Sequence, residues 1–330
     1  MTKSVHSRCK EGGGRSVRKR PPRKHPTRAK RTYTKRKCQT HTNRKAVGNH
    51  CGQLRKHGSP RCKKVTIVYG ERRDGKLRYM YAPFIETCQH KYPKAVLKLA
   101  ARNVYKRLGP SDTLIFIGCG YAVDGPERII RPFPNYKQLR KRGVHTIVFW
   151  TEPCVCKQNS DETWYYSKYL TTRHPGSSFQ HLFVKDKPII DYRRFSKNTA
   201  KLVFLGSLEY RSKEVANLMR SIPYFIERYD LFTKDKFDSF LVKVPHIYVS
   251  ICKEGSCVLP SARINRLLSS GAIIISQHCN PVDDALYNDL IWFCSLDEIH
   301  DTSKMLMDKS PRELHDLSRT IKEVAKKRFA

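Results

Sequence analysis

The sequence is short of acidic residues and of long apolar runs. Its 29 aspartate and glutamate residues stand against 65 lysine and arginine residues, which gives a formal net charge of +36. It contains no apolar run near the roughly 20 residues of a membrane-spanning helix, and no secretory segment at its start. We therefore expect a chain that neither spans nor enters a bilayer by itself. The charge favours polyanionic partners, either nucleic acid or an acidic membrane face.

Several catalytic motifs are also missing. The sequence has no GxxxxGK[ST] phosphate loop, no HExxH and no ordered Ser-His-Asp set, which argues against P-loop NTPase, zinc protease and serine hydrolase chemistry. Gly118 and Gly120 form only a GCG, because a dinucleotide fingerprint needs a third glycine where Val123 stands. NAD binding is not expected.

Residues 1–64 are the most basic part of the chain. They contain 22 lysine and arginine residues and one acidic residue, Glu11, and very few aliphatic side chains. Such a segment cannot bury enough apolar surface to offset the entropy of ordering, so we predict a disordered basic arm. It could bind nucleic-acid phosphates, serve as a nuclear-import signal, or act only as a solvated tail.

The end of this arm combines thiols with imidazoles in a short segment. Such a set could form a tetrahedral zinc site, and the alternative is free thiols in a flexible head. The candidate ligands are Cys38, Cys51 and Cys62, with His50 as the fourth ligand and His41 or His57 as substitutes.

The chain contains 12 cysteines but no secretory signal, which predicts reduced thiols in an intracellular compartment, cytoplasm or nucleus. Several of them lie in or beside apolar segments, where a thiol behaves as a small hydrophobic side chain: Cys119, Cys252, Cys279 and Cys294.

Residues 65–330 alternate between short apolar, β-branched runs and helical segments. Buried parallel strands are predicted at TLIFIG, HTIVFW, HIYVSI and AIIIS. Helices are predicted over 92–108 and 135–142, and DETWYYSKYL is predicted to form one from Asp161. This pattern predicts an α/β fold with two Rossmann-like, doubly wound domains, over 65–195 and 196–330.

The segment from His246 to Cys294 is the most informative. A helix over 262–270 lies between two strands, and Gly271 ends it. Arg263 and Asn265 stand close to the positive N-terminus of this helix, which suits a phosphate group. Ligands of open parallel sheets bind at the carboxyl ends of the strands, so a nucleotide-phosphate pocket is predicted here.

SARINRLLSSGAIIIS resembles the nucleotide-sugar-binding segment of GT-B glycosyltransferases, in the family-1-like group of giant DNA viruses and bacterial spore coats. TLIFIGCG, RGVHTIVFWTEP and DETWYYSKYL resemble the first half of the same group. The chain differs from the family where Pro260, Arg266 and Gln277 replace carboxylates. The resemblance implies that a glutamate at position 266 would hold the ribose hydroxyls, a role that Arg266 cannot take as an acceptor.

A donor site follows from these residues. The turn at Gly206 and Ser207 can present free N–H groups to a diphosphate, although packing alone also explains a Gly-Ser turn. The resemblance places Arg211 next to this turn, and Lys253 and Arg263 could converge on it from neighbouring strand ends. Such cations would stabilise a departing diphosphate without a metal. The alternative is that they are solvated surface charges.

The candidate general bases are Glu152, after the strand HTIVFW, and Asp124, in the loop GCGYAVDG. Either carboxylate could take the proton of an acceptor hydroxyl, and either could instead cap a helix or stabilise a turn.

Two functions are consistent with the sequence. The first is a glycosyltransferase that uses a UDP- or GDP-sugar and a glycan or protein acceptor. The second is a GT-B fold without activity, acting as a basic nucleic-acid-binding or virion-associated protein. Arg266 and the net charge favour the second.

Overall fold

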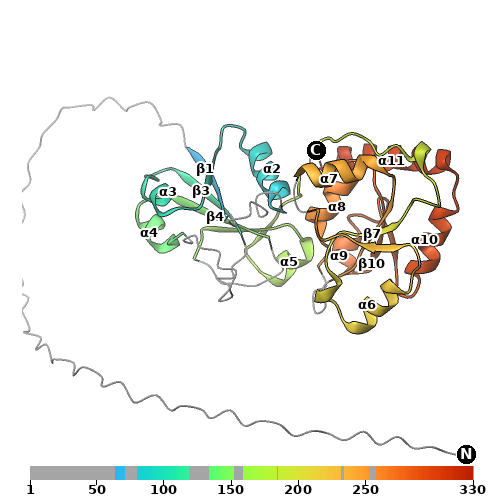
Figure 1. Cartoon of the computed structure of the whole chain (residues 1–330). Coiled ribbons are helices and arrows are strands. Elements are labelled where there is room, and N and C mark those ends of the chain that lie inside the picture. The colour runs from blue at the N-terminus through green and yellow to red at the C-terminus, as the bar shows by residue number, and fades with distance from the viewer. Residues whose placement is uncertain are drawn as a thin grey trace, which may run out of the picture. The chain divides into compact units, whose positions relative to one another are not determined.

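Two fully parallel sheets organise the part of the chain that our computed structural model describes (Figure 1). The strand order is β2-β1-β3-β4-β5-β6 in the first sheet and β11-β10-β9-β7-β8 in the second. Every strand pairs with its neighbours in parallel, which requires crossover connections and matches the predicted α/β class. The described residues are 64–70, 80–118, 134–151, 159–183, 185–231, 234–252 and 258–329.

The first sheet and its helices cover the chain from Val65 to Phe179. Its elements are β1 (Val65–Tyr69), α2 (Ala82–Lys91), β2 (Val96–Leu99), α3 (Arg102–Lys106), β3 (Thr113–Gly118), α4 (Tyr136–Lys141), β4 (His145–Trp150), β5 (Glu162–Tyr165), α5 (Lys168–Arg173) and β6 (Ser178–Phe179).

The second sheet begins after a short 3₁₀ helix. Its elements are η1 (Tyr192–Arg194), β7 (Leu202–Phe204), η2 (Leu208–Tyr210), α6 (Lys213–Arg220), β8 (Phe225–Glu227), α7 (Lys234–Lys243), β9 (Ile247–Ser250), α8 (Ser261–Leu268), β10 (Ile273–Gln277), α9 (Pro281–Asp284), β11 (Trp292–Cys294), α10 (Ile299–Met307) and α11 (Pro311–Phe329).

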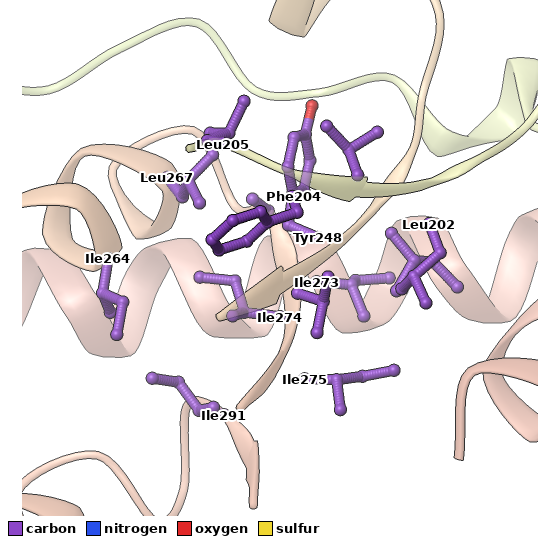
Figure 2. Packing of buried hydrophobic residues seen from close by; sticks show 14 of the residues in the cluster. Leu202, Phe204, Leu205, Tyr248, Ile264, Leu267, Ile273, Ile274, Ile275 and Ile291 are labelled. Atoms are coloured by element: carbon purple, nitrogen blue, oxygen red, sulfur yellow. The ribbon is translucent and has the colours of Figure 1, made fainter. Parts of the chain in front are cut away.

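Each sheet has its own hydrophobic core. The predicted strands TLIFIG, HTIVFW, HIYVSI and AIIIS form β3, β4, β9 and β10, and most of their side chains are buried. Figure 2 shows Ile273, Ile274 and Ile275 of β10 packed among side chains from β7, β9 and α8. Continuous apolar runs are buried here because helices cover both faces of a parallel sheet.

The segment that precedes β7 belongs to the second core. The second core already includes Ile190 and Tyr192, ahead of position 196. Tyr192 is fully buried, and its hydroxyl donates to the carbonyl of His246 and accepts from the N–H of Ile273. The segment before β7 therefore joins the amino ends of β9 and β10. The predicted arm of residues 1–64 lies outside the described residues except for Lys64.

Two predicted helices are wrong. The segment 92–108 contains β2 and the short α3 instead, and the long helix lies earlier, in α2. Pro93 lacks a backbone donor, and β2 is held by its pairing with β1. DETWYYSKYL starts as β5, because Asp161 accepts from the backbone N–H and the hydroxyl of Thr146 at 2.8 and 2.7 Å. The helix α5 begins only after Ser167, which caps it.

Gly271 ends α8 as the sequence predicts. Its φ of +70° lies in the left-handed region, which favours glycine. A Cβ at this position would lie 2.5 Å from the carbonyl oxygen of Ser318 in α11. The glycine thus allows both the turn into β10 and the close approach of the last helix.

One pair of cysteines corrects the prediction of reduced thiols. Cys252 follows β9, Cys279 follows β10, and a disulfide joins them with their Cα atoms 6.6 Å apart. Cys88 and Cys294 are free and buried. The sequence places the two bonded cysteines after adjacent strands, but only the sheet order brings them together.

Candidate active site

A cavity of about 420 Å³ lies at the carboxyl ends of strands from both sheets. This is the edge at which open parallel sheets bind ligands, and the volume suits a small molecule. Elements around the first sheet contribute Met80, Tyr81, Phe84, Thr151 and Tyr166 to its lining. The remaining lining residues are Leu205, Gly206, Ser207, Tyr210, Arg211, Arg228, Tyr229, Leu231, Phe237, Ile251, Cys252, Val258, Pro260, Ala262, Arg263 and Arg266.

The turn after β7 comes close to the Phe204 ring. A Cβ on Gly206 would lie 3.0 Å from the Phe204 ring and 3.4 Å from Nη1 of Arg263, so only glycine fits without a shift. Ser207 caps η2 by accepting from the Glu209 N–H. The next N–H, that of Leu208, already donates to Glu227. The N–H groups of Gly206 and Ser207, which the sequence predicts as phosphate donors, make no hydrogen bond to any described residue.

Arg211 and Arg263 come from different elements and meet at one aromatic ring. Their guanidinium carbons lie 5.4 and 5.7 Å from the centroid of Phe204, within cation–π range. Arg211 is also fixed by a 2.9 Å hydrogen bond from Nη2 to the carbonyl of Ile251. The structure thus brings Gly206, Ser207, Arg211 and Arg263 to one cavity.

The environment of Arg211 is unfavourable for a cation without an anionic partner. Burial lowers the pKa of its guanidinium. Its Nε is buried and has no hydrogen-bond partner in the described part of the chain. Thr151, also in the lining, has a buried Oγ1 that likewise makes no hydrogen bond to a described residue. A bound anion or hydroxyl-rich ligand would satisfy both groups.

Two further arginines line the cavity. Arg228 makes a two-pronged ion pair with Asp230, at 2.8 and 2.9 Å, and Asp230 raises its pKa. Arg266 lies over the ring of Phe237 at 4.9 Å. Within the described residues, no acidic side chain lines the cavity. The site is therefore cationic, and its aromatic side chains offer flat apolar surfaces.

Asn265 lies outside the cavity, unlike the prediction. It is 2 % exposed, its Nδ2 donates to the carbonyl of Leu182, and its Oδ1 accepts from the Tyr287 hydroxyl. On α8, the positions that face the cavity are Ala262, Arg263 and Arg266. Asn265 therefore stabilises the packing behind the helix.

The remaining predicted residues lie outside the described residues. These are the candidate bases Asp124 and Glu152, the cation Lys253, and the zinc candidates Cys38, Cys51, Cys62 and His50. Among the residues that are described, no three His, Cys, Asp or Glu side chains form a metal-binding group, and no helix is long and apolar enough to cross a membrane.

The sequence reasoning missed the aromatic part of the site. Tyr229 and Arg228 directly follow β8, a three-residue strand whose side chains are only partly buried and which therefore leaves little apolar signal. Tyr210 lies at the end of η2. Met80, Tyr210 and Tyr229 are large hydrophobic side chains that are 43 to 57 % exposed, all at this cavity. For Tyr229, its position just after a strand was the signal available.

No protein-family model matches the chain, and no curated protein matches its sequence. Similar solved structures include Anabaena HepE in complex with UDP, at 7 % identity and a TM-score of 0.44, covering 81 % of this chain and 95 % of that one. An α1,3-fucosyltransferase is 10 % identical with a TM-score of 0.39, covering 82 and 93 % of the two chains. A UDP-N-acetylglucosamine 2-epimerase is 11 % identical with a TM-score of 0.36, covering 78 and 90 %.

These TM-scores are too low to assign a family or an activity. The fold and the site together define a two-sheet α/β protein with a cationic, aromatic cavity at its strand ends.

Proposed function

We propose that the chain is a GT-B-like glycosyltransferase that binds the diphosphate of a UDP- or GDP-sugar in this cavity. The observation that carries the proposal is the meeting of Arg211 and Arg263 beside the Gly206 turn. A diphosphate needs opposite charge and close backbone approach, and this turn offers both.

The chemistry assigned to these residues is stabilisation of the leaving group. In sugar transfer, the bond between the anomeric carbon and the diphosphate oxygen breaks, and an acceptor oxygen bonds to the same carbon. Negative charge grows on the departing diphosphate. Arg211 and Arg263 would neutralise it from positions fixed before reaction, so little reorganisation would be needed.

The proton of the acceptor hydroxyl must go to a base. Asp124 and Glu152 remain our candidates for that role. In the sequence, Asp124 follows β3 and Glu152 follows β4. These two strands are parallel neighbours, and Thr151, directly after β4, lines the cavity. The aromatic lining, including Tyr210 and Tyr229, would contact the nucleoside or the sugar.

Calorimetry of the full chain with UDP, GDP, UDP-glucose and GDP-fucose tests the donor site. We expect one nucleotide series to bind, and Arg211→Ala or Arg263→Ala to weaken it about 10- to 100-fold, because each removes a charge-assisted contact. Arg220→Ala, on an exposed face of α6 and outside the cavity lining, is the matched control. No binding, or equal loss in the control, would contradict the proposal.

Turnover is tested separately by release of UDP or GDP from the sugar that binds. Asp124→Asn and Glu152→Gln should leave nucleotide binding within about twofold, while one of them should slow release at least tenfold. If neither variant slows release, the base lies elsewhere.

A further inference from the structure

The first sheet carries a basic surface on the two helices that precede β3 and β4. It is formed by α3 and α4, and we name it the α3/α4 face: Arg102, Lys106 and Arg107 from α3 and its end, with Lys137 and Lys141 from α4. All five side chains are exposed, and neither helix contains an acidic residue.

Arg142 joins the two helices. Its guanidinium donates to the carbonyls of Tyr105 and Lys106, both at 2.9 Å, and also to that of Leu108. These carbonyls belong to the end of α3, where a cation also offsets the helix dipole. Since α4 ends at Arg142, the hydrogen bonds hold α3 and α4 side by side (Figure 1). The five exposed cations therefore lie on two neighbouring helices whose carboxyl ends are held together.

The carboxylates near the α3/α4 face are already paired with other groups. Asp161 pairs with Arg140 at 2.8 Å, and Glu162 contacts His145 at 2.8 Å. Asp112 accepts from the Gly109 N–H. None of the five cations forms an ion pair with another described residue. Only solvent ions or a bound polyanion can therefore screen the repulsion among these cations.

Lys64 contacts the start of β3, next to the loops that precede β3 and β4. The carbonyl of Lys64 accepts from the N–H of Thr113 at the start of β3, directly after the loop that follows α3. The next loop is adjacent as well, because the N–H of His145 donates to the carbonyl of Asp112. Lys64 therefore lies at the amino end of β3, and the other lysine and arginine residues of 1–64 precede it in the sequence.

From these observations we propose that the α3/α4 face binds the phosphate backbone of double-stranded nucleic acid, independently of the cavity. Lysine and arginine contacts to phosphates supply sequence-independent affinity. A duplex is favoured over a single strand because the aromatic residues of the two helices, Tyr105 and Tyr136, are buried and offer no stacking surface. A membrane is less suitable, since neither helix has an exposed large hydrophobic side chain to insert.

The decisive experiment compares two triple variants of the full chain that change the charge equally. In the face variant, Lys106→Gln, Lys137→Gln and Lys141→Gln remove three cations of the α3/α4 face. In the control variant, Lys213→Gln, Lys304→Gln and Lys327→Gln remove three exposed lysines from helices around the second sheet. Binding to a DNA duplex of about 20 base pairs, two helical turns, is measured by fluorescence anisotropy across a salt series.

We expect the face variant to lower the slope of log affinity against log salt by about 2 to 3, since each lost phosphate contact removes about 0.9. The control variant should keep the wild-type slope within about 0.5. Equal effects in both variants would overturn the proposal in favour of diffuse charge, and an unchanged face variant would assign binding to the arm alone.

Two further probes separate the partner classes. A single strand of the same length should bind the wild-type protein more weakly, and its affinity should fall less in the face variant. Vesicles containing phosphatidylserine should not compete for the duplex; if they bind in its place, the face is a membrane surface and the proposal fails. Nucleotide binding should be unchanged in both variants. The result for the duplex is therefore independent of the proposed function of the cavity.

Discussion

The hydroxyl of Ser167 donates a 2.6 Å hydrogen bond to Asp283, a carboxylate that is 2 % exposed and lies 116 residues further along the chain. Asp283 also accepts from the backbone N–H of Tyr169 at 3.1 Å and from the side chain of Asn280. Asp283 of α9 thus accepts hydrogen bonds from two donors at the N-terminus of α5, a helix of the first sheet.

Removing this carboxylate should destabilise the fold. Asp283→Ala leaves the Ser167 hydroxyl and the Tyr169 N–H without their acceptor, so we expect a loss of about 2–4 kcal/mol in the free energy of unfolding. Urea denaturation followed by circular dichroism measures it. Asp301→Ala, at a side chain that is 88 % exposed, should stay within about 0.5 kcal/mol. Equal losses would mean that the buried hydrogen bonds contribute nothing.

Gly271→Ala should lower the free energy of unfolding more than a glycine substitution that strains only the backbone. Gly176 has a φ of +84° but no atom within 4 Å of its Cβ position, so Gly176→Ala reports the backbone cost, about 1 kcal/mol. Gly271→Ala adds the clash with Ser318, for a total of about 2–4 kcal/mol. Thermal unfolding of both variants checks this order, and similar melting temperatures would show that α11 moves aside at little cost.

Gly206→Ala should reduce nucleotide binding, while Gly118→Ala should not. Both glycines lie two residues after a strand phenylalanine, and a Cβ at either position would meet that ring at 3.0 Å. The two substitutions should therefore cost similar stability, about 1–3 kcal/mol. Only Gly206 lines the cavity, so we expect about a tenfold loss of UDP or GDP affinity there alone. Parallel losses in calorimetry would contradict the assigned site.

Acid should weaken the fold through His246. Burial, with smaller effects of Arg228 and Lys201, lowers the pKa of this imidazole to about 4. The unfolded chain has the ordinary pKa near 6.5, so it takes up the proton first as the pH falls. The contribution of His246 to stability is thus complete above about pH 6.5 and is lost progressively toward pH 4.

The substitution His246→Asn isolates this effect. Its side-chain oxygen can accept the Lys201 N–H that His246 Nδ1 accepts at 3.2 Å, but it does not titrate. Urea denaturation at pH 7 and pH 5 should show a smaller loss of stability in the variant than in the wild-type protein. An equal loss would exclude His246 as its source.

Reduction of the Cys252–Cys279 disulfide should also destabilise the chain. The bond closes a loop with a sequence separation of 27, for which the chain-entropy model predicts about 3.5 kcal/mol. The double variant Cys252→Ser and Cys279→Ser should match the reduced wild-type protein in urea denaturation. Cys294→Ala serves as the control for a free thiol, and it should still respond to a reductant. A wild-type protein that does not respond would show that the bond is not formed in solution.

Most strands could be predicted because continuous β-branched runs such as those of β4 and β10 have no amphipathic alternative. The helix before Gly271 was equally clear, since its end requires a residue that tolerates positive φ. The segments 92–108 and 161–170 were misjudged because their apolar residues suit either period, and pairing with β1 and β4 decides between strand and helix.

The candidate site divides in the same way. Gly206, Ser207, Arg211 and Arg263 were accessible to sequence reasoning, because each follows a recognisable strand or begins a recognisable helix. Asn265 was misplaced, since its neighbours Leu182 and Tyr287 come from distant segments. The aromatic rim at Tyr210 and Tyr229 required the sheet order, which places β8 beside β7.

The sequence alone determined the α/β class, the excess of positive charge and the turn at Gly206, because these depend on local pattern and composition. Only the tertiary structure decided which charges meet. It placed Arg211 and Arg263 on one ring, joined Cys252 to Cys279, and held the ends of α3 and α4 together through Arg142. Contacts between residues far apart in the chain depend on strand order, which local sequence patterns do not encode.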